Sequence, residues 1–370
     1  MLTISRIQGD ISGELNTEIE NYLPCKNHVI RSATGRSLIN NLINKLGISK
    51  VDSVLLPAYV PEGLLHPLIR NHINILYYKL DQQLFPDLDH LSDLISSNNR
   101  IKLCFVIHPM GFEAPISEIS SLLKINDIFL VEDCAQGLFS KYNNGGFFGE
   151  EGTFSLFSLN KFLPICDGAF LLSDLDIMKP KNHLSSKTLE KGALDAYHKH
   201  LNNNRIIRDS IYQNDVKELI KQSSNAYDQY YTFIDTDLSI YRISNQSIKT
   251  LSCFDIDSLI ENRRNNVIVL YEKLNSRLFQ FLYPKYNENI IPMAIPVIVN
   301  EKRQKVIEEL MCRNILPSIQ DNKWNVSFIR KNKDHFIFEN DFIERHLLIP
   351  IAEHFTKDEM LYLANSMNSL

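Results

Sequence analysis

The chain has 370 residues, of which 44% are hydrophobic and 22% are charged, so it can bury a large core and form two domains. Its formal net charge of -5 lacks the basic excess that nucleic acid and anionic membranes attract. No stretch approaches the roughly 20 apolar residues of a membrane span, and the N-terminus "MLTISRIQGD" has no signal-peptide pattern. We therefore expect a cytoplasmic protein whose partners are small molecules, not nucleic acid or membrane.

The six cysteines are scattered along the chain and form no C-x-x-C pair. This spacing argues against a zinc ribbon and against a disulfide framework. We assign no metal ligands from the sequence.

From residue 30 onward the chain alternates helical and extended patterns, which is typical of a βαβ series with a mostly parallel sheet. The segment 34–47 has apolar residues at helical spacing, with Thr34 as its cap and Gly47 at its end. Strands are predicted at "SVLLPA", "INILYYKL", "IKLCFVIH" and "IFLVED", with helices at "PEGLLHPLIRN", "LDHLSDLISS" and "ISEISSLLKI" between them. In such sheets ligands bind beyond the carboxyl ends of the strands, where Pro57, His108 and Asp133 fall.

The second half of the chain begins with an Asn/Gly-rich turn and two predicted strands, "TFSLFS" and "GAFLLS", with Lys161 between them. The polar segment 175–237 has helical character but no chemical signature, and we interpret it as a connecting region. A long helix from about residue 251, a strand at "IPMAIPVIV", a helix at "EKRQKVIEELMCRN" and a last helix with a Thr356/Glu359 capping box follow. We expect a large α/β domain over 1–250 that packs firmly against a small α+β domain over 251–370.

Asp133 follows the apolar run "IFLV", where an acid costs free energy unless a cation meets it. Such an acid is typical of a magnesium ligand, a ribose contact or a helix N-cap. It also suits the protonated pyridinium nitrogen of pyridoxal 5'-phosphate (PLP). PLP further needs a lysine, a phosphate site and a donor to its phenolic oxygen, and Lys161, the helix start "SATGRS" and Gln136 can supply them.

The joint arrangement resembles the DegT/DnrJ/EryC1/StrS family of PLP-dependent aminotransferases, which act chiefly on nucleotide-linked keto sugars. "ATGRSLINNL" is similar to its S-G-x-x-A-L phosphate-binding helix, "LLPAYVPEG" to its P-x-x-x-F segment, and "VIHPMGFEAPISEI" to its H-x-x-G stretch. The block "VEDCAQGLFSKYNNGGFFGEEGTFSLF" is the most specific match, and "NKFLPICDGAFLLS" and "YRISNQ" follow in the family's order. The resemblance implies a fold-type I PLP-dependent transferase, aspartate aminotransferase-like, with a mostly parallel seven-stranded sheet in its large domain.

The resemblance also implies roles for individual residues. Lys161 becomes the Schiff-base lysine and general base, Asp133 the partner of the pyridinium and Gln136 the neighbour of the ring oxygen. The phosphate would be held by four residues at two positions in the chain: Thr34, Gly35 and Arg36 at the helix start, and Ser158, since Leu156 stands where the family has a serine.

Four further residues have less definite places. Tyr59 either stacks on the cofactor or packs the helix behind it. His108 is more simply a supporting histidine than a catalyst, but it stays a candidate substrate contact. The family's active sites form at a homodimer interface, so Tyr241 and Arg242 are expected to reach the neighbouring subunit's site.

The function implied is the transfer of an amino group from glutamate or glutamine to a keto sugar, nucleotide-linked, in surface polysaccharide or related biosynthesis. Ile240 replaces a family asparagine, and Cys166 and Ala169 replace glycines, which places the chain in a divergent branch. The alternatives are a PLP enzyme that acts on a non-sugar amino acid or a carrier-bound substrate, and a noncatalytic relative that acts as a binding protein.

Overall fold

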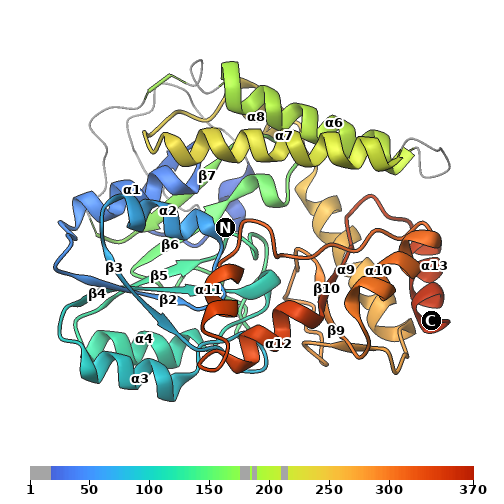
Figure 1. Ribbon diagram of the computed structural model, residues 1–370. Coiled ribbons are helices and arrows are strands. Elements are labelled where there is room, and N and C mark those ends of the chain that lie inside the picture. Colours follow the sequence, from blue (N-terminus) through green and yellow to red (C-terminus); the bar gives the residue numbers. More distant parts are fainter. Residues whose placement is uncertain (1–17, 176–183, 186–189, 210–215) are drawn as a thin grey trace.

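The structure is a computed structural model that describes residues 18–175, 184–185, 190–209 and 216–370 (Figure 1). A seven-stranded sheet has the order β1-β7-β6-β5-β4-β2-β3. Its five central and outer strands β6, β5, β4, β2 and β3 are mutually parallel, whereas β7 runs antiparallel to both of its neighbours. The strands are β1 (His28–Ser32), β2 (Ser53–Pro57), β3 (Asn74–Tyr78), β4 (Ile101–Ile107), β5 (Phe129–Asp133), β6 (Phe154–Ser158) and β7 (Ala169–Ser173).

Helices cover both faces of this sheet, which explains why its central strands are buried along most of their length rather than at alternating positions. In β4, for example, only Lys102 is exposed. Helices α1 (Gly35–Lys45) and α2 (Glu62–Arg70) lie on one face, and α3 (Leu88–Ser97) and α4 (Ile116–Ile125) lie on the other (Figure 1). The carboxyl ends of β2, β4 and β5 consequently open toward the second half of the chain.

The second half contains a three-stranded antiparallel sheet of order β10-β9-β8, formed by β8 (Phe279–Phe281), β9 (Ile295–Val299) and β10 (His346–Ile349). The helices around it are α8 (Asn245–Leu251), α9 (Ile256–Lys273), α10 (Arg303–Cys312), α11 (Val326–Lys331), α12 (Ile337–Arg345) and α13 (Lys357–Asn368). One continuous apolar cluster joins this region to the face of the large sheet that carries α3 and α4, so the two halves share a core. No helix in the described residues is both long enough and apolar enough to span a membrane.

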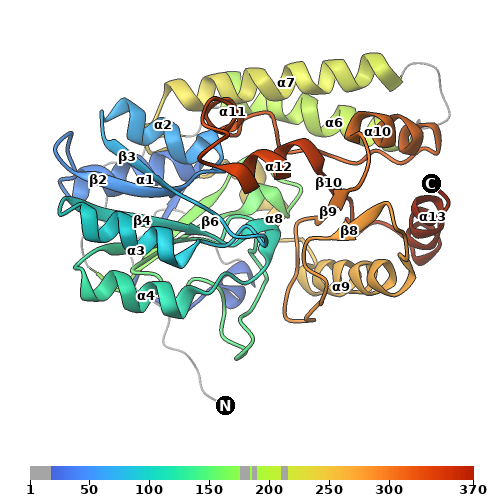
Figure 2. The ribbon, with the colours of Figure 1, turned by 60° about the horizontal axis from the view of Figure 1, so that its bottom comes forward.

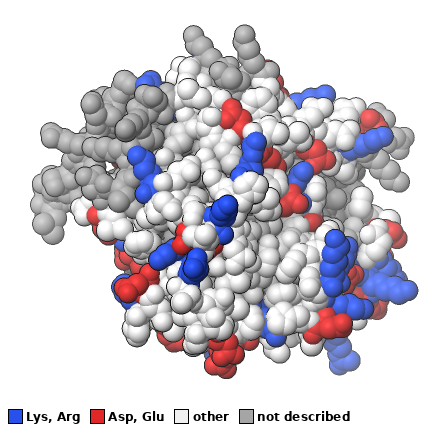
Figure 3. Space-filling model, turned by 60° about the vertical axis from the view of Figure 1, so that its left-hand side comes forward, with Lys and Arg blue, Asp and Glu red and all other residues white. Residues whose placement is uncertain are grey.

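Two antiparallel helices, α6 (Asp195–Asp209) and α7 (Val216–Thr236), form a hairpin over α1 and α2 that reaches toward the region of the three-stranded sheet (Figures 1 and 2). Tyr230 and Ile234 of α7 are buried in an apolar cluster with Tyr197 of α6 and with Ala33 and Cys166. Figure 3 shows one face of the molecule, on which basic and acidic side chains are interspersed over the described residues.

The predicted α/β architecture is confirmed, with a mostly parallel seven-stranded sheet and a smaller α+β region. Thr34 caps α1 by accepting from the Ser37 N–H, and the Thr356/Glu359 capping box opens α13. The sequence pattern did not reveal β1, β8 and β10, which have five, three and four residues. β8 and β10 carry too few alternating positions to be recognised before their pairing partners are known. β1 is as long as most of the strands that were recognised, but its sequence HVIRS has only two apolar residues.

Candidate active site

Asp133 is the last residue of β5, and its carboxylate is almost entirely buried, with 4% of the residue exposed. One carboxylate oxygen accepts from the Ala135 N–H at 2.9 Å. Burial raises the pKa of this carboxyl, and the charge of Lys161 and the hydrogen bond from Ala135 offset only part of that rise. The ionised form of Asp133 is therefore only partly stabilised by its protein neighbours, and a cation closer than Lys161 would stabilise it further.

Lys161 ends the short 3-10 helix Leu159–Lys161, between β6 and β7, and its side chain is exposed. Its neighbour Phe162 is buried and lies under the guanidinium of Arg263 from α9, 5.2 Å from the ring centre. The backbone around Lys161 is thus held in place while the ammonium group is left free to move, which suits a lysine that must reach a reacting atom.

Gln136 lies in the turn after β5 and is buried, with 2% of the residue exposed. Its side-chain oxygen accepts from the Met110 N–H at 2.7 Å. Because the carbonyl end of the amide is fixed in this way, its NH2 end is the end that can donate to a ligand. The structure thus gives Gln136 the polarity expected of a donor to a phenolic oxygen.

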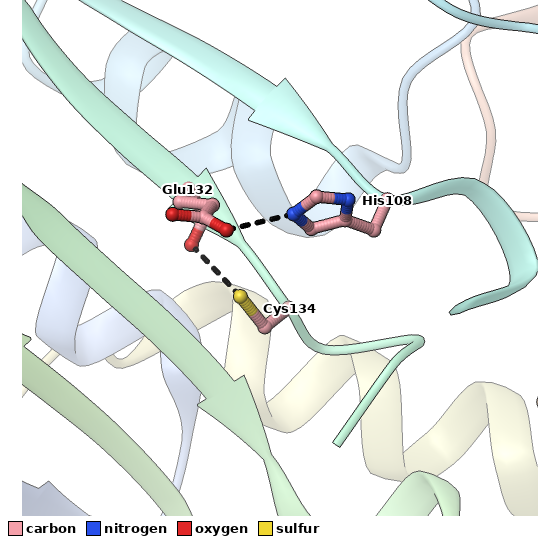
Figure 4. Close-up of side chains that lie close together, drawn as sticks. All are labelled: His108, Glu132 and Cys134. Carbon is pink, nitrogen blue, oxygen red and sulfur yellow. Dashed lines mark hydrogen bonds and ion pairs between the residues drawn. The ribbon is translucent and has the colours of Figure 1, made fainter. Parts of the chain in front are cut away.

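A buried polar network of His108, Glu132 and Cys134 lies at the ends of β4 and β5 (Figure 4). Because successive side chains of a strand point to opposite faces, Glu132 lies on the other face of β5 from Asp133. Glu132 and His108 are both 0% exposed, and the His108 Nε2 lies 2.8 Å from a Glu132 oxygen. Among the described residues, one group brings possible metal-ligating atoms within 4.8 Å of one another: His108, Glu132 and Cys134. Their polar atoms are instead engaged with the protein, since the Glu132 carboxylate also accepts from Tyr142 and from two backbone N–H groups, Gly149 and Gly152. His108 therefore lies away from solvent, in a supporting position.

The start of α1 is where the sequence predicts the phosphate site. Thr34 and Gly35 are half-buried at the helix N-terminus, where free backbone N–H groups favour a phosphate. A Cβ on Gly35 would lie 3.7 Å from Leu156, so this N-terminus lies against β6. Ser158, at the end of β6, donates its hydroxyl to Asn160 at 2.9 Å.

The Arg36 side chain extends toward α7 and is engaged there with protein groups. Its Nε lies 2.6 Å from Asp235 of α7, and its guanidinium lies 4.6 Å from the centre of the Tyr231 ring. The same Asp235 oxygen is 2.8 Å from His66 Nδ1 of α2. The Arg36 guanidinium therefore ties α1 to α7, which leaves its backbone N–H as the part available to a phosphate.

Tyr59 forms a wall of the site beyond the end of β2. Its ring stacks on Trp324, at 4.3 Å between ring centres, and its hydroxyl donates to the Gln320 carbonyl at 2.8 Å. The two rings line an apolar cavity together with Pro57, Tyr78, Ile107 and Met110. Of the two interpretations of Tyr59, packing is the one visible in this structure: besides Trp324, the ring meets Phe342 of helix α12, with 5.3 Å between ring centres.

Tyr241 and Arg242 lie next to the start of α1. Tyr241 is buried within its own chain: its carbonyl accepts from the Ala33 N–H at 2.9 Å and its hydroxyl donates to Asp237 at 2.5 Å. Arg242 is exposed. The following turn is fixed by Asp167, which accepts from the backbone N–H and the hydroxyl of Ser244, both at 2.7 Å. Arg242 is thus the member of this pair that a second subunit could contact.

Two functional features were missed from the sequence. Glu132 precedes Asp133 in the same strand, so alternation places its acid on the opposite face, and that alternation was the signal available. Asp235 stands in the polar segment 175–237, where the sequence offers no sign that one acid would receive Arg36 and His66.

The chain is similar to known proteins in sequence and in fold. A profile of the DegT/DnrJ/EryC1/StrS aminotransferase family matches residues 4–209. GDP-perosamine synthase of Escherichia coli O157:H7 is 27% identical over 176 residues, 44% of this chain and 45% of that protein. The pleiotropic regulatory protein of Geobacillus stearothermophilus is 23% identical over 177 residues, 47% of each chain. The chain thus aligns with about half the length of these curated relatives.

Among solved structures, Spr1654 from Streptococcus pneumoniae in its PLP form has a TM-score of 0.70 and 14% identity. The match covers 97% of this chain and 91% of that one. At this identity the likeness shows the fold, which is that of fold-type I PLP-dependent transferases.

Proposed function

Because the chain belongs to the DegT/DnrJ/EryC1/StrS aminotransferase family, we propose that it is a PLP-dependent aminotransferase. It transfers an amino group from glutamate or glutamine to a nucleotide-linked keto sugar, for surface polysaccharide or a related product. The observation that carries the proposal is the buried Asp133 carboxylate at the end of β5, with Gln136 three residues on and the charge of Lys161 within electrostatic range.

The residues of this chain fit PLP by their chemistry. Bound PLP supplies a protonated pyridine ring that withdraws electrons from the reacting carbon. Asp133 would hold the proton on the ring nitrogen, and the Gln136 NH2 group would donate to the phenolic oxygen. Thr34 and Gly35 offer the N-terminus of α1 to the phosphate. Lys161 would bond the cofactor and would take and return a proton at the substrate carbon.

The keto-sugar part of the proposal is supported by the name of the Escherichia coli relative, a GDP-perosamine synthase. An apolar cavity lined by Tyr59 and Trp324 lies beside the ends of β2 and β4, next to the same site. A purified protein given glutamate should yield the aminated form of the correct keto sugar, and a panel of nucleotide-linked keto sugars, keto acids and carrier-bound ketones separates this proposal from the non-sugar alternative.

The first experiment tests cofactor attachment. Purified protein should be yellow with PLP, glutamate should bleach the colour, and borohydride should fix the cofactor to Lys161. Lys161→Ala should lose the colour and the covalent link while its melting curve remains cooperative. A wild-type protein that stays colourless after incubation with excess PLP and removal of the unbound cofactor would overturn the proposed function. A yellow protein that no amino donor bleaches would favour a noncatalytic relative.

We also propose that the site is completed by a second copy of the chain. A phosphate with nearly two negative charges favours charged donors, but the guanidinium of Arg36 is paired with Asp235. Arg242 is exposed beside the start of α1, so in a closed two-fold dimer it would serve the other subunit's phosphate.

Mixed dimers test this arrangement. Lys161→Ala chains and Arg242→Ala chains are each expected to be nearly inactive, and a mixture should recover part of the activity because some mixed dimers carry one intact site. Sedimentation that shows an active monomer, or no recovery in mixed dimers verified by mass, would refute the shared site.

A further inference from the structure

We propose that Glu132 is a positioning residue for the cofactor: through His108 it fixes the turn 108–111, and that turn directs the amide of Gln136. The inference rests on the proposed function, since it concerns how this chain holds PLP. It assigns a task to a buried acid that touches neither substrate nor cofactor.

The first step is the ionised state of Glu132. Burial by itself would raise the pKa of its carboxyl, but hydrogen bonds from His108, Tyr142 and Gly149 lower the pKa overall. One oxygen accepts from His108 at 2.8 Å and from Gly149 N–H at 2.7 Å, and the other accepts from Gly152 N–H at 2.8 Å. Two of the donors are backbone groups, so the position of the carboxylate is set by the fold.

The second step is the orientation of His108. Its Nδ1 accepts from the Ala114 N–H at 3.1 Å, so the ring proton is on Nε2, which donates to Glu132. The ring also stacks on Phe148, with 3.9 Å between ring centres. An imidazole held on both nitrogens and on one face leaves a single orientation, and Figure 4 shows it directed from the end of β4 toward Glu132.

The third step is the turn that His108 begins. Met110 has φ of 55° and Gly111 has φ of 95°, both in the left-handed region, which a residue such as Met110 occupies only when its surroundings hold it there. A Cβ on Gly111 would lie 2.7 Å from the Gln136 carbonyl, so the turn packs directly on the Gln136 backbone. In that conformation the Met110 N–H reaches the Gln136 side-chain oxygen at 2.7 Å.

The consequence is a chain of contacts from Glu132 through His108 and Met110 to Gln136. If it is broken, the amide of Gln136 is free to rotate, and the donor to the phenolic oxygen of PLP is lost. That oxygen then holds its proton more tightly, so the pH at which the visible colour of bound PLP changes should rise by about one unit, as expected for loss of one hydrogen bond to a charged oxygen.

The experiment measures this pH midpoint by absorbance, together with the PLP dissociation constant and the melting temperature. Gln136→Ala should raise the midpoint by about one unit and weaken PLP binding about tenfold. Glu132→Gln, and His108→Phe as a variant that keeps the ring stack on Phe148, should raise the midpoint by the same amount. Combining either with Gln136→Ala should add no further shift, because all act through one amide. His108→Gln, which keeps a donor and an acceptor, should restore part of the shift.

Tyr142→Phe is the matched control. It removes another buried donor to the same Glu132 oxygen but leaves the path through His108 to Gln136 intact. It should lower the melting temperature and leave the midpoint at its wild-type value. Wild-type midpoints in folded Glu132→Gln or His108→Phe protein, no midpoint shift in Gln136→Ala, or additive shifts in the double variants would overturn the inference alone. A colourless wild-type protein would overturn the proposed function and this inference with it.

Discussion

Two regions of the molecule hold charged side chains out of water by different means. Behind the strand ends, Glu132 is 0% exposed and two of its hydrogen-bond donors are backbone N–H groups. At the contact between α7 and the rest of the protein, the charges of Arg36 and Asp235 meet through side chains alone, at 2.6 Å. The second region also includes Lys323, which lies 3.7 Å from Asp228. We refer to Arg36, His66, Asp228, Asp235 and Lys323 as the α7 contact.

The difference matters because a backbone donor cannot move away when its partner is changed, whereas a long side chain can turn to water. The strand-end site, by which we mean Glu132, Asp133 and their hydrogen-bond partners, should therefore respond sharply to the loss of one atom or one charge. In the α7 contact, the loss in the free energy of unfolding on breaking an ion pair should increase with the burial of that pair. Within the strand-end site, the two adjacent acids also differ from each other: the pKa of Asp133 is raised, whereas that of Glu132 is lowered.

The largest effect is expected from Asp133→Asn, and it should have opposite signs for activity and for stability. Turnover should fall by orders of magnitude, because the ring nitrogen loses the charge that keeps it protonated. The free energy of unfolding of the cofactor-free protein at pH 7 should rise by about 1 kcal/mol, because a buried, unpaired charge is removed. Steady-state kinetics and urea unfolding without PLP measure the two effects.

The sign of that stability change has a pH signature. The pKa of Asp133 is higher in the folded protein than its ordinary value of 3.8, so the folded state loses stability as the pH rises from that value through the folded pKa. The gain from Asp133→Asn should be absent below this window and complete above it. Near-normal turnover, or a loss of stability in the cofactor-free variant at pH 7, would give Asp133 a different task.

The next effect in size is the loss of stability in Glu132→Gln. An amide at this position directs NH2 hydrogens at backbone donors, and we expect the free energy of unfolding at pH 7 to fall by about 3 kcal/mol. The pKa of Glu132 is below its ordinary value of 4.5, so this contribution is present above that pH and is lost as the pH falls through the folded pKa. Urea unfolding at pH 7 and near pH 3 should show the difference between wild type and variant shrinking in acid. A constant difference would contradict an ionised Glu132.

The contrast between the regions also marks how far the sequence predicts the structure. Helix α1 and its Thr34 cap are local features, and Asp133 and Gln136 share one strand and turn, so their pattern is visible in a short window. The partners of Glu132 are not visible in such a window, because Gly149 and Gly152 meet it only after the loop beyond β5 has folded back. The pairing of Arg36 with Asp235 joins two helices far apart in the chain and has no periodic signature.

A moderate effect is expected from Asp235→Asn. It leaves Arg36, whose side chain is 12% exposed, without its anionic partner, and we expect a loss of about 2 kcal/mol in the free energy of unfolding, since breaking one side of a mostly buried pair leaves an uncompensated charge. Hydrogen exchange should increase first in α7, because Asp235 anchors that helix to both α1 and α2. The double variant Arg36→Met with Asp235→Leu should recover most of the stability. Equal loss in the single and double variants would show that the pair is not the anchor.

The smallest effect is expected from Asp228→Asn, in the same contact region. The Asp228 side chain is 47% exposed and that of Lys323 is 25% exposed, with 3.7 Å between their charged atoms, so water and salt screen the pair and we expect a change below about 0.5 kcal/mol in the free energy of unfolding. Lys323 would also keep its position over the Tyr231 ring, 5.8 Å from the ring centre. Urea unfolding at low salt and at 1 M salt should show a small difference that vanishes with salt. A loss comparable to that of Asp235→Asn would mean that the α7 contact acts as one cooperative unit, and burial would then no longer rank its ion pairs.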